Sequence, residues 1–114
     1  MKPMRIDTAA DEAAAFLRAM GHPARLRIVC ALVNQERAAS PLAAVAGIRA
    51  PALSQHAAIL EADGLISRRR DGRTILYRLA APRAKKLARL LQQIYCGPTR
   101  RVSRRRPSAR RRLP

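Results

Sequence analysis

The sequence predicts a mainly α-helical protein that carries one small β-hairpin, and two neighbouring stretches carry this prediction. In residues 52–62, apolar side chains recur at the spacing of one helical face, with Leu53 and Ala57 on that face. In residues 65–79 the period falls to two, and an Asp-Gly pair at 71–72, a strong hairpin signal, separates two short runs. A helix followed at once by a basic hairpin is typical of a recognition helix and its wing. We therefore predict a winged helix-turn-helix with five helices.

The first two helices are predicted by apolar spacing between two break points. Residues 1–8 are expected to be a flexible N-terminal arm, with Asp7 or Thr8 capping the first helix. That helix should end at Gly21, and the next should begin at Pro23, because a proline in the first turn loses no helical hydrogen bond. The expected apolar faces are Ala13, Phe16, Leu17 and Met20 in the first helix, and Leu26, Val29, Cys30 and Val33 in the second.

A short helix over residues 38–47 and a long final helix over residues 82–96 complete the predicted domain, which spans residues 9–96. Ser40 is expected to cap the short helix, and Gly47 to make the turn into the recognition helix. The side chains expected to face inward are Leu42, Val45 and Ala46 in the short helix, and Leu87, Leu90, Leu91 and Ile94 in the final one.

The charge balance indicates a polyanionic partner. The chain has 24 Lys and Arg against 7 Asp and Glu, a formal net charge of +17 over 114 residues. Aromatic residues, on which single-stranded bases stack, make up only 3% of the chain, so double-stranded DNA is the expected partner. Residues 97–114 hold eight arginines, three prolines and no acidic residue. This composition predicts a disordered tail that either holds phosphates non-specifically or has little role.

No sequence feature indicates a membrane protein, a secreted protein or an enzyme. The sequence contains no apolar run of transmembrane length, no secretory signal and no catalytic motif or phosphate-binding loop. We therefore expect a cytoplasmic protein that is not an enzyme and needs no cofactor. In that reducing compartment, Cys30 and Cys96 are not expected to form a routine structural disulfide.

Two stretches resemble the ArsR/SmtB family of bacterial winged-helix repressors. They are GHPARLRIV, at residues 21–29, and LSQHAAILEADGLISRRRDGRTILYRL, at residues 53–79. The resemblance covers about residues 10–96 and implies a homodimer joined through the first and last helices. Such a dimer would place two recognition helices about one DNA turn apart, roughly 34 Å, over an imperfect palindrome. Both terminal helices carry apolar faces that a domain of this size cannot bury alone, which independently favours the dimer.

The predicted DNA contacts come from the recognition helix and the wing. Family members often place base-contacting polar residues at the start of the recognition helix, where this chain has Ala50 and Pro51. We therefore expect more of the binding to rest on DNA shape and on phosphate contacts. His56 lies beside the apolar stripe, and we interpret it as mainly structural. The residues expected to contact DNA are Arg49, Ser54, Gln55 and His56 in the recognition helix, and Arg68, Arg70, Arg73 and Arg78 in the wing.

The inducer is expected to act on the two cysteines. Cys30 in the second helix and Cys96 at the end of the last resemble the cysteines of the persulfide- and redox-sensing branch of the family, the biofilm-growth-associated and sulfide-responsive repressors. By that resemblance, a reactive sulfur species or an oxidant would link them by a disulfide or a short polysulfide, and DNA would be released. Arg27 or Arg100 is expected to lower the pKa of one thiol.

Three alternatives remain open. Cys30 could be a small buried apolar side chain with no sensing role. The protein could instead be a metal- or arsenite-responsive repressor. The sequence disfavours this alternative, because the last helix has no His, Asp or Glu and no cysteine lies between residues 31 and 95. A protein of another class, an architectural protein that coats DNA without sequence preference, is the third.

Overall fold

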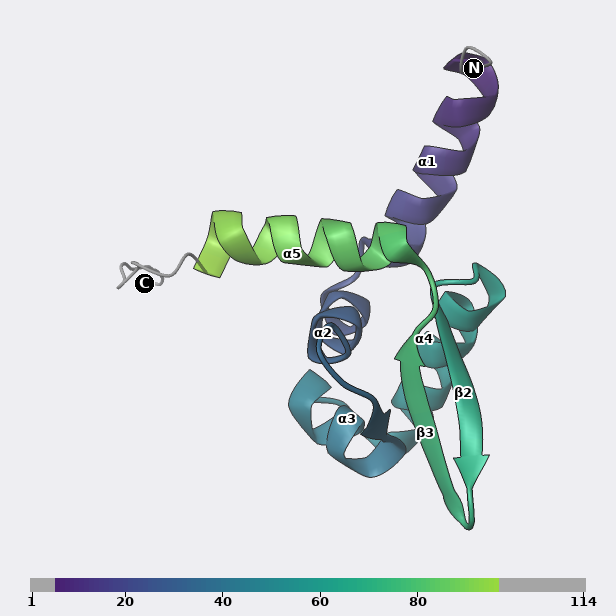
Figure 1. The fold of residues 1–114 in the computed structure, drawn as a ribbon, viewed down its shortest axis with the longest axis vertical. Coiled ribbons are helices and arrows are strands. Elements are labelled where there is room, and N and C mark those ends of the chain that lie inside the picture. Colours follow the sequence, from purple (N-terminus) through teal and green to yellow (C-terminus); the bar gives the residue numbers. More distant parts are fainter. Residues whose placement is uncertain (1–5, 97–114) are drawn as a thin grey trace.

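The computed structural model describes residues 6–96, which form five helices and three strands (Figure 1). In chain order they are α1 (Ile6–Met20), α2 (Pro23–Ala31), β1 (Arg37–Ala38), α3 (Ala39–Ala46), α4 (Ala50–Ala62), β2 (Ile66–Asp71), β3 (Thr74–Leu79) and α5 (Pro82–Cys96). The predicted architecture, a mainly α-helical winged helix-turn-helix with five helices, is confirmed. The predicted tail over residues 97–114 and most of the predicted N-terminal arm lie outside the described residues.

The recognition helix and its turn follow the prediction closely. Gly47 ends α3 in the left-handed conformation, with φ of 73°, which a residue without a side chain adopts at little cost. The predicted inner face of α4 is buried, since Leu53, Ala57 and Leu60 are each no more than 2% exposed. These three side chains anchor α4 in the core, and the opposite face of the helix is left open to solvent.

The hairpin forms where the sequence predicts it. Ile66 lies opposite Leu79 at its base, and Asp71 lies opposite Thr74 at its tip. Gly72 takes a φ of 67° in the turn, as the Asp-Gly pair predicts. The hairpin therefore extends away from the helices as a narrow two-stranded wing (Figure 1).

A third strand, β1, was not predicted, and it changes how α3 begins. Arg37 lies opposite Tyr77 of β3, and the strand is too short to show any apolar period. Its extended backbone continues through Ala38, which is the residue that precedes α3. The prediction that Ser40 caps this helix was wrong, because Ser40 already lies inside the first turn.

Two inner faces differ from the prediction in their residues. In α3, Val45 is 51% exposed and Ala43 is buried in its place, because α3 packs closely on α2 and the contact needs a small side chain. In α2, Ile28 is fully buried, whereas Leu26 and Cys30 are only partly buried. The apolar side of α2 is thus turned toward Ile28 relative to the predicted stripe.

The first helix begins earlier than predicted. It starts at Ile6, so Asp7 and Thr8 lie in its first turn, and the prediction that one of them caps the helix was wrong. An aspartate such as Asp7 suits the capping position, and it also suits the first turn, where the helix dipole favours negative charge. Its presence therefore does not decide at which residue the helix begins. The start of α2 is confirmed, because His22 caps it through a hydrogen bond from the Ala24 N–H to Nδ1, at 3.1 Å.

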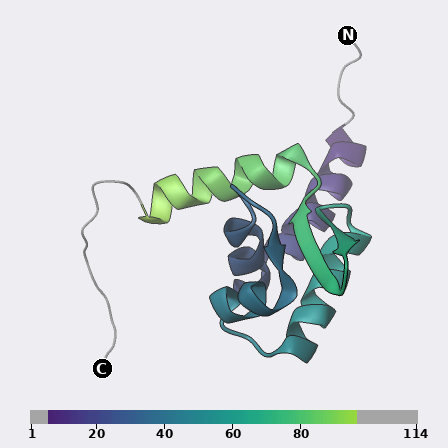
Figure 2. The same ribbon diagram turned by 60° about the horizontal axis from the view of Figure 1, so that its bottom comes forward.

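Helices α1 and α5 project from the body of the molecule in different directions (Figures 1 and 2). Fully buried Ala84 and Ala88 let α5 approach α2 closely along its inner side. The outer sides keep large apolar side chains in solvent, namely Leu17, Leu90 and Ile94, which are 55%, 49% and 58% exposed. These apolar surfaces have no partner within the described part of one chain. Among residues 6–96, no helix is long and apolar enough to cross a membrane.

Candidate DNA interface and dithiol site

Three of the residues predicted to contact DNA lie on the open face of α4 or directly before it. Arg49 precedes the helix in extended conformation and is exposed, and its carbonyl accepts a hydrogen bond from the Leu53 N–H at 2.9 Å. Ser54 and Gln55 are exposed in the first half of the helix, on the side opposite the buried Leu53. Their hydroxyl and amide groups are therefore available to base edges or phosphates in a DNA groove.

His56, the fourth, lies in a polar cluster that joins three helices. Its ring lies 4.4 Å from the ring of His22, and its Nδ1 lies 3.3 Å from a guanidinium nitrogen of Arg25. Arg25 also donates to the carbonyls of Ala19 and Arg18 at the end of α1, at 2.6 and 3.2 Å. Burial lowers the pKa of His56, and the neighbouring His22 and Arg25 lower it further. This environment favours the structural interpretation of His56.

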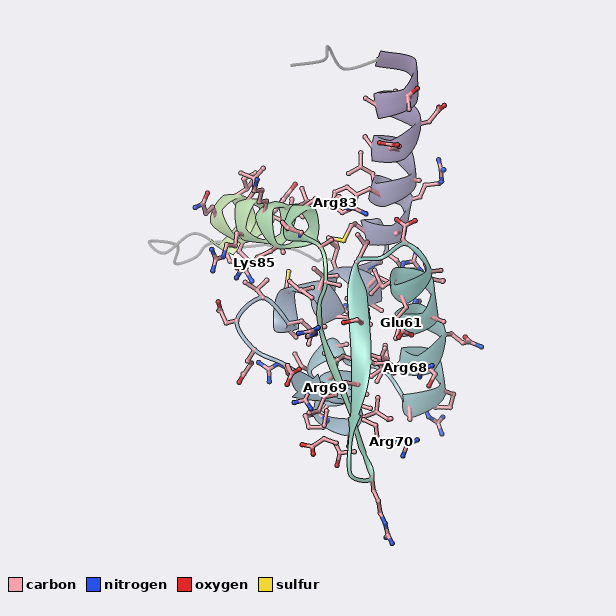
Figure 3. The ribbon with its side chains drawn as sticks, turned by 45° about the vertical axis from the view of Figure 1, so that its right-hand side comes forward. Glu61, Arg68, Arg69, Arg70, Arg83 and Lys85 are labelled. Atoms are coloured by element: carbon pink, nitrogen blue, oxygen red, sulfur yellow. The ribbon has the colours of Figure 1, made fainter. Side chains whose placement is uncertain are left out.

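Two of the wing arginines are held by carboxylates. Arg68 forms an ion pair with Glu61 at the end of α4, at 3.2 Å, and Figure 3 shows the two side chains between the helix and β2. Arg69 donates two hydrogen bonds to the Glu36 carboxylate in a bidentate ion pair, with both nitrogen–oxygen distances at 2.9 Å. The pKa of the Glu36 carboxyl is lowered, chiefly by its hydrogen bond from Arg69. These pairs connect the wing to the body of the domain on two sides.

Glu36, Glu61 and Arg69 were not predicted as functional residues, and Arg68 was predicted to contact DNA without a competing partner. No short-range signal indicates the Glu36–Arg69 pair, because Glu36 lies in the loop before β1 and Arg69 lies in β2. A weak signal exists for Glu61, since few acidic residues occur in this chain and this one lies a few residues before the basic hairpin.

The remaining predicted wing residues lie nearer to solvent. Arg70 and Arg73 flank the hairpin turn and are exposed, and neither forms an ion pair within residues 6–96. Figure 3 shows Arg70 near the tip of the hairpin. Arg78 is exposed and donates to the Ser67 hydroxyl at 3.3 Å. The tip of the wing thus presents guanidinium groups whose charge is not neutralised by a neighbouring carboxylate, which suits contact with phosphate.

The two cysteines line one hollow between α2 and α5. Cys30 is partly buried on α2, Cys96 is exposed at the end of α5, and both are free thiols. The hollow measures about 390 Å³, and its lining is completed by Leu26, Leu91, Gln92 and Tyr95. Two residues far apart in the sequence are therefore brought to the same small space by the packing of α5 on α2.

The electrostatics of Cys30 differ from the prediction. Burial raises the pKa of its thiol, and the nearby Cys96 raises it further, whereas a hydrogen bond from Gln92 acts in the opposite direction. Arg27 was expected to lower the pKa of a thiol, but its guanidinium instead donates to the Ala46 carbonyl of α3 at 3.1 Å. Arg100 lies outside the described residues. The lower exposure of Cys30 favours Cys96 as the first of the two to react.

No three His, Cys, Asp or Glu side chains gather at one point within the described range, so this part of the chain contains no group that could enclose a metal ion.

Comparison with known proteins agrees with this geometry. The family described as "Bacterial regulatory protein, arsR family" matches residues 22–68, which include the helix-turn-helix. The "Biofilm growth-associated repressor" of Agrobacterium fabrum is 39% identical over 89 residues, covering 78% of this chain and 76% of that protein.

Two solved structures carry the same fold. Reduced HlyU from Vibrio cholerae N16961 superposes with a TM-score of 0.77 at 33% identity, covering 80% of this chain and 96% of that one. The homodimeric winged helix-turn-helix DNA-binding domain of Mb0332 from Mycobacterium bovis superposes with a TM-score of 0.69 at 28% identity, covering 82% and 86%.

Proposed function

This chain belongs to the ArsR family of bacterial regulatory proteins, and from that premise we propose that it is a thiol-switched transcriptional repressor. It binds an imperfectly palindromic operator as a homodimer in the cytoplasm. It releases the operator when Cys30 and Cys96 are bridged by a reactive sulfur species or an oxidant. The observation that carries the proposal is that these two thiols, from α2 and from the end of α5, line one hollow.

The dimer is supported by the apolar surfaces that one chain leaves uncovered. Leu17 of α1 and Leu90 and Ile94 of α5 are about half exposed, and burying them against a second copy removes apolar area from water. A related domain that superposes on this chain is homodimeric. In the proposed dimer, two copies of α4 face successive turns of the major groove, on the order of 34 Å apart.

The recognition helix α4 and the wing contact different parts of the DNA. Ser54, Gln55 and Arg49 reach base edges from α4, while Arg70 and Arg73 reach phosphates from the tip of the wing. The Glu61–Arg68 pair links the wing to the end of α4 and occupies a guanidinium that could otherwise contact phosphate. The high positive charge of the chain adds a salt-dependent, sequence-independent attraction.

The bridging step is ordinary thiol–persulfide exchange. The Cys96 thiolate attacks the terminal sulfur of an organic persulfide, RSSH, which leaves a Cys96 persulfide and expels RS⁻. The Cys30 thiolate then attacks the inner sulfur of that persulfide, forming the Cys30–Cys96 disulfide and expelling hydrosulfide. The net reaction consumes two thiols and one RSSH and yields one disulfide, one RSH and one molecule of hydrogen sulfide.

A contact at the other end of α5 provides a route from the bridge to the DNA-binding face. Arg83, in the first turn of α5, donates to the carbonyl of Asp63 at the end of α4, at 3.3 Å. The same guanidinium lies 5.6 Å above the ring of Phe16 in α1. Figure 3 shows Arg83 near the junction of α5 and α1. A shift of α5 when the thiols join is therefore transmitted to the end of the recognition helix.

The test compares wild type with Cys30→Ser and Cys96→Ser, which leave one thiol each. DNA sites are first selected from a random duplex pool with the reduced protein, and affinity is then measured by fluorescence anisotropy before and after addition of an organic persulfide. We expect wild type to lose about 5- to 150-fold in affinity, the usual range for coupled sites, and to recover it with dithiothreitol.

Both serine variants should bind the same sites as tightly as reduced wild type and should not respond. Mass spectrometry should locate the sulfur bridge between the peptides that contain Cys30 and Cys96. Release of DNA by both variants would disprove the switch, and failure to select any preferred site would favour non-specific coating of DNA instead.

A further inference from the structure

The hollow beside the two thiols is larger than a bond between them requires. Its volume of about 390 Å³ lies within the range of small-molecule pockets, roughly 300–1,000 Å³. It is open enough for Cys96 to remain exposed, and Tyr95 at its edge is 74% exposed. The space is therefore accessible to a reagent that carries more than a single sulfur atom.

The walls of the hollow are apolar in a protein where charge is abundant. Leu26 and Leu91 form its sides, Tyr95 its rim, and Gln92 is its one amide. No Lys, Arg, Asp or Glu from the described residues lines it. Three other hollows in the described part of the chain each include charged side chains. Those charged residues are Glu36, Arg78 and Lys85 in the first hollow, Glu12, Asp63 and Arg83 in the second, and Arg18, Arg25 and Asp63 in the third.

The hollow also lies apart from the surface that the proposed dimer buries. At 100° per residue, Tyr95 lies about 140° around α5 from Leu90, which belongs to the outer apolar side. Leu90 and Ile94, which are 49% and 58% exposed, do not line the hollow. A second copy that packs on these two side chains therefore need not cover it.

We propose that this hollow binds the inducer before the chemistry, and that it selects neutral, apolar organic carriers of sulfane sulfur, such as short dialkyl trisulfides, over charged carriers. The inference rests on the proposed thiol switch and adds the chemical class of its inducer. An alkyl group gains by leaving water for the walls formed by Leu26 and Leu91. A carboxylate or ammonium would lose hydration there without an ionic partner among the lining residues that the structure describes, so a charged carrier is disfavoured.

The reaction with a neutral trisulfide, RS–S–SR, balances within the hollow. The exposed Cys96 thiolate attacks the central sulfur and expels the first RS⁻, which leaves Cys96–S–S–S–R. The Cys30 thiolate then attacks the same central sulfur and expels the second RS⁻. The products are a trisulfide bridge between the two cysteines and, after protonation, two molecules of RSH, and no further oxidant is needed.

The test measures the rate of bridge formation in the reduced, full-length protein with diallyl trisulfide and with the charged glutathione trisulfide. Each rate is divided by that of the same carrier with a short unstructured cysteine peptide, which removes differences in intrinsic reactivity. Salt is held at roughly 0.5 M so that the +17 chain does not attract the anionic carrier from a distance. We expect the normalised rate to be at least about tenfold higher for diallyl trisulfide and to saturate with its concentration, as a bound complex requires.

Two further measurements separate binding in the hollow from simple collision. An unreactive dialkyl thioether of similar length should slow the reaction of diallyl trisulfide competitively. Leu91→Gln should remove the saturation, whereas the matched control Val45→Gln, an exposed position on α3, should not.

Equal normalised rates for both carriers, rising linearly with concentration, would overturn the inference while leaving the thiol switch intact. Failure of both trisulfides in a protein that an organic persulfide still bridges would overturn the inference alone. Failure of the organic persulfide as well to bridge Cys30 and Cys96 would overturn the switch itself, and the inference with it.

Discussion

The wing and the cysteine hollow show how differently this chain uses charge in two regions. At the wing, arginines crowd along one hairpin, and two of them are held by Glu36 and Glu61. At the hollow, no charged side chain of the described residues lines the space, and burial raises the pKa of the Cys30 thiol. The first region suits contact with a polyanion in water, and the second suits a neutral reagent that must leave water. Among residues 6–96, positive charge thus gathers along the wing and does not line the hollow.

Ala88→Leu should disturb the hollow region most and leave the wing unchanged. Ala88 is fully buried where α5 meets α2, so a larger side chain forces the helices apart, at a cost of about 1–3 kcal/mol in unfolding free energy. We also expect slower bridging of Cys30 and Cys96, because α5 carries Cys96 away from α2. Chemical denaturation and bridging kinetics measure the two effects. Unchanged stability and unchanged bridging would contradict the packing described for α5.

The double variant Arg70→Gln/Arg73→Gln should weaken DNA binding without affecting bridge formation. Two phosphate contacts are lost in each protomer, four in the proposed dimer, so affinity should fall by at least about tenfold and the slope of log affinity against log salt should shrink by about 3 to 4. Titrations at several salt concentrations measure both quantities. The variant Lys85→Gln/Lys86→Gln, which removes the same charge from α5, is the control and should change the slope less. An equal change in the control would indicate a diffuse charge effect.

Arg83→Gln tests the connection between the two regions. Loss of its contacts with the Asp63 carbonyl and the Phe16 ring should reduce the ratio of affinities between reduced and bridged protein by about 3- to 10-fold, within the usual range of coupling. Arg89→Gln, an exposed position on the same helix, should lower both affinities equally and preserve the ratio. Bridging itself, followed by mass spectrometry, should proceed normally in both variants. An unchanged ratio in Arg83→Gln would exclude this route.

Glu61→Gln should have a smaller effect at the wing. The exposed pair with Arg68 is worth about 0–1 kcal/mol, so stability should change little. Removing the carboxylate frees Arg68 for phosphate, and DNA affinity should rise by about two- to five-fold at low salt. Glu12→Gln removes the same charge on α1 and serves as the control. A loss of affinity in Glu61→Gln would show that the pair is needed to position the wing.

The smallest expected effect is the pH dependence contributed by His56. Its pKa in the folded protein is lowered below the ordinary value of about 6.5, so the unfolded chain binds a proton more readily. Stability from this group is complete above that ordinary value and is lost as the pH falls below it. Wild type should therefore lose more thermal stability than His56→Gln between about pH 7.5 and 5.5. Equal losses would contradict the described environment of His56.

The elements that the sequence predicted correctly depend on signals from residues close together along the chain. The inner face of α4, the Asp-Gly turn at 71–72 and the His22-Pro23 helix start all follow from local backbone preferences and apolar spacing. The prediction failed where the local sequence allowed a helix to begin at more than one residue, as it does near Ser40. There the pairing of β1 with β3 set an extended backbone at Ala38, and α3 begins directly after it.

The sequence by itself determined that the chain forms a basic winged helix-turn-helix, which helix is the recognition helix, and which two cysteines are candidates for a thiol switch. Only the tertiary structure decided which residues each charged or reactive side chain contacts. The pairing of Arg69 with Glu36, the turn of α2 toward Ile28 and the shared hollow of Cys30 and Cys96 each join residues from separate elements. The physical reason is that these contacts arise when α5 and the hairpin pack on the core. Periodicity reports which face of a helix is apolar, whereas the partner across a contact is set by how whole elements pack together.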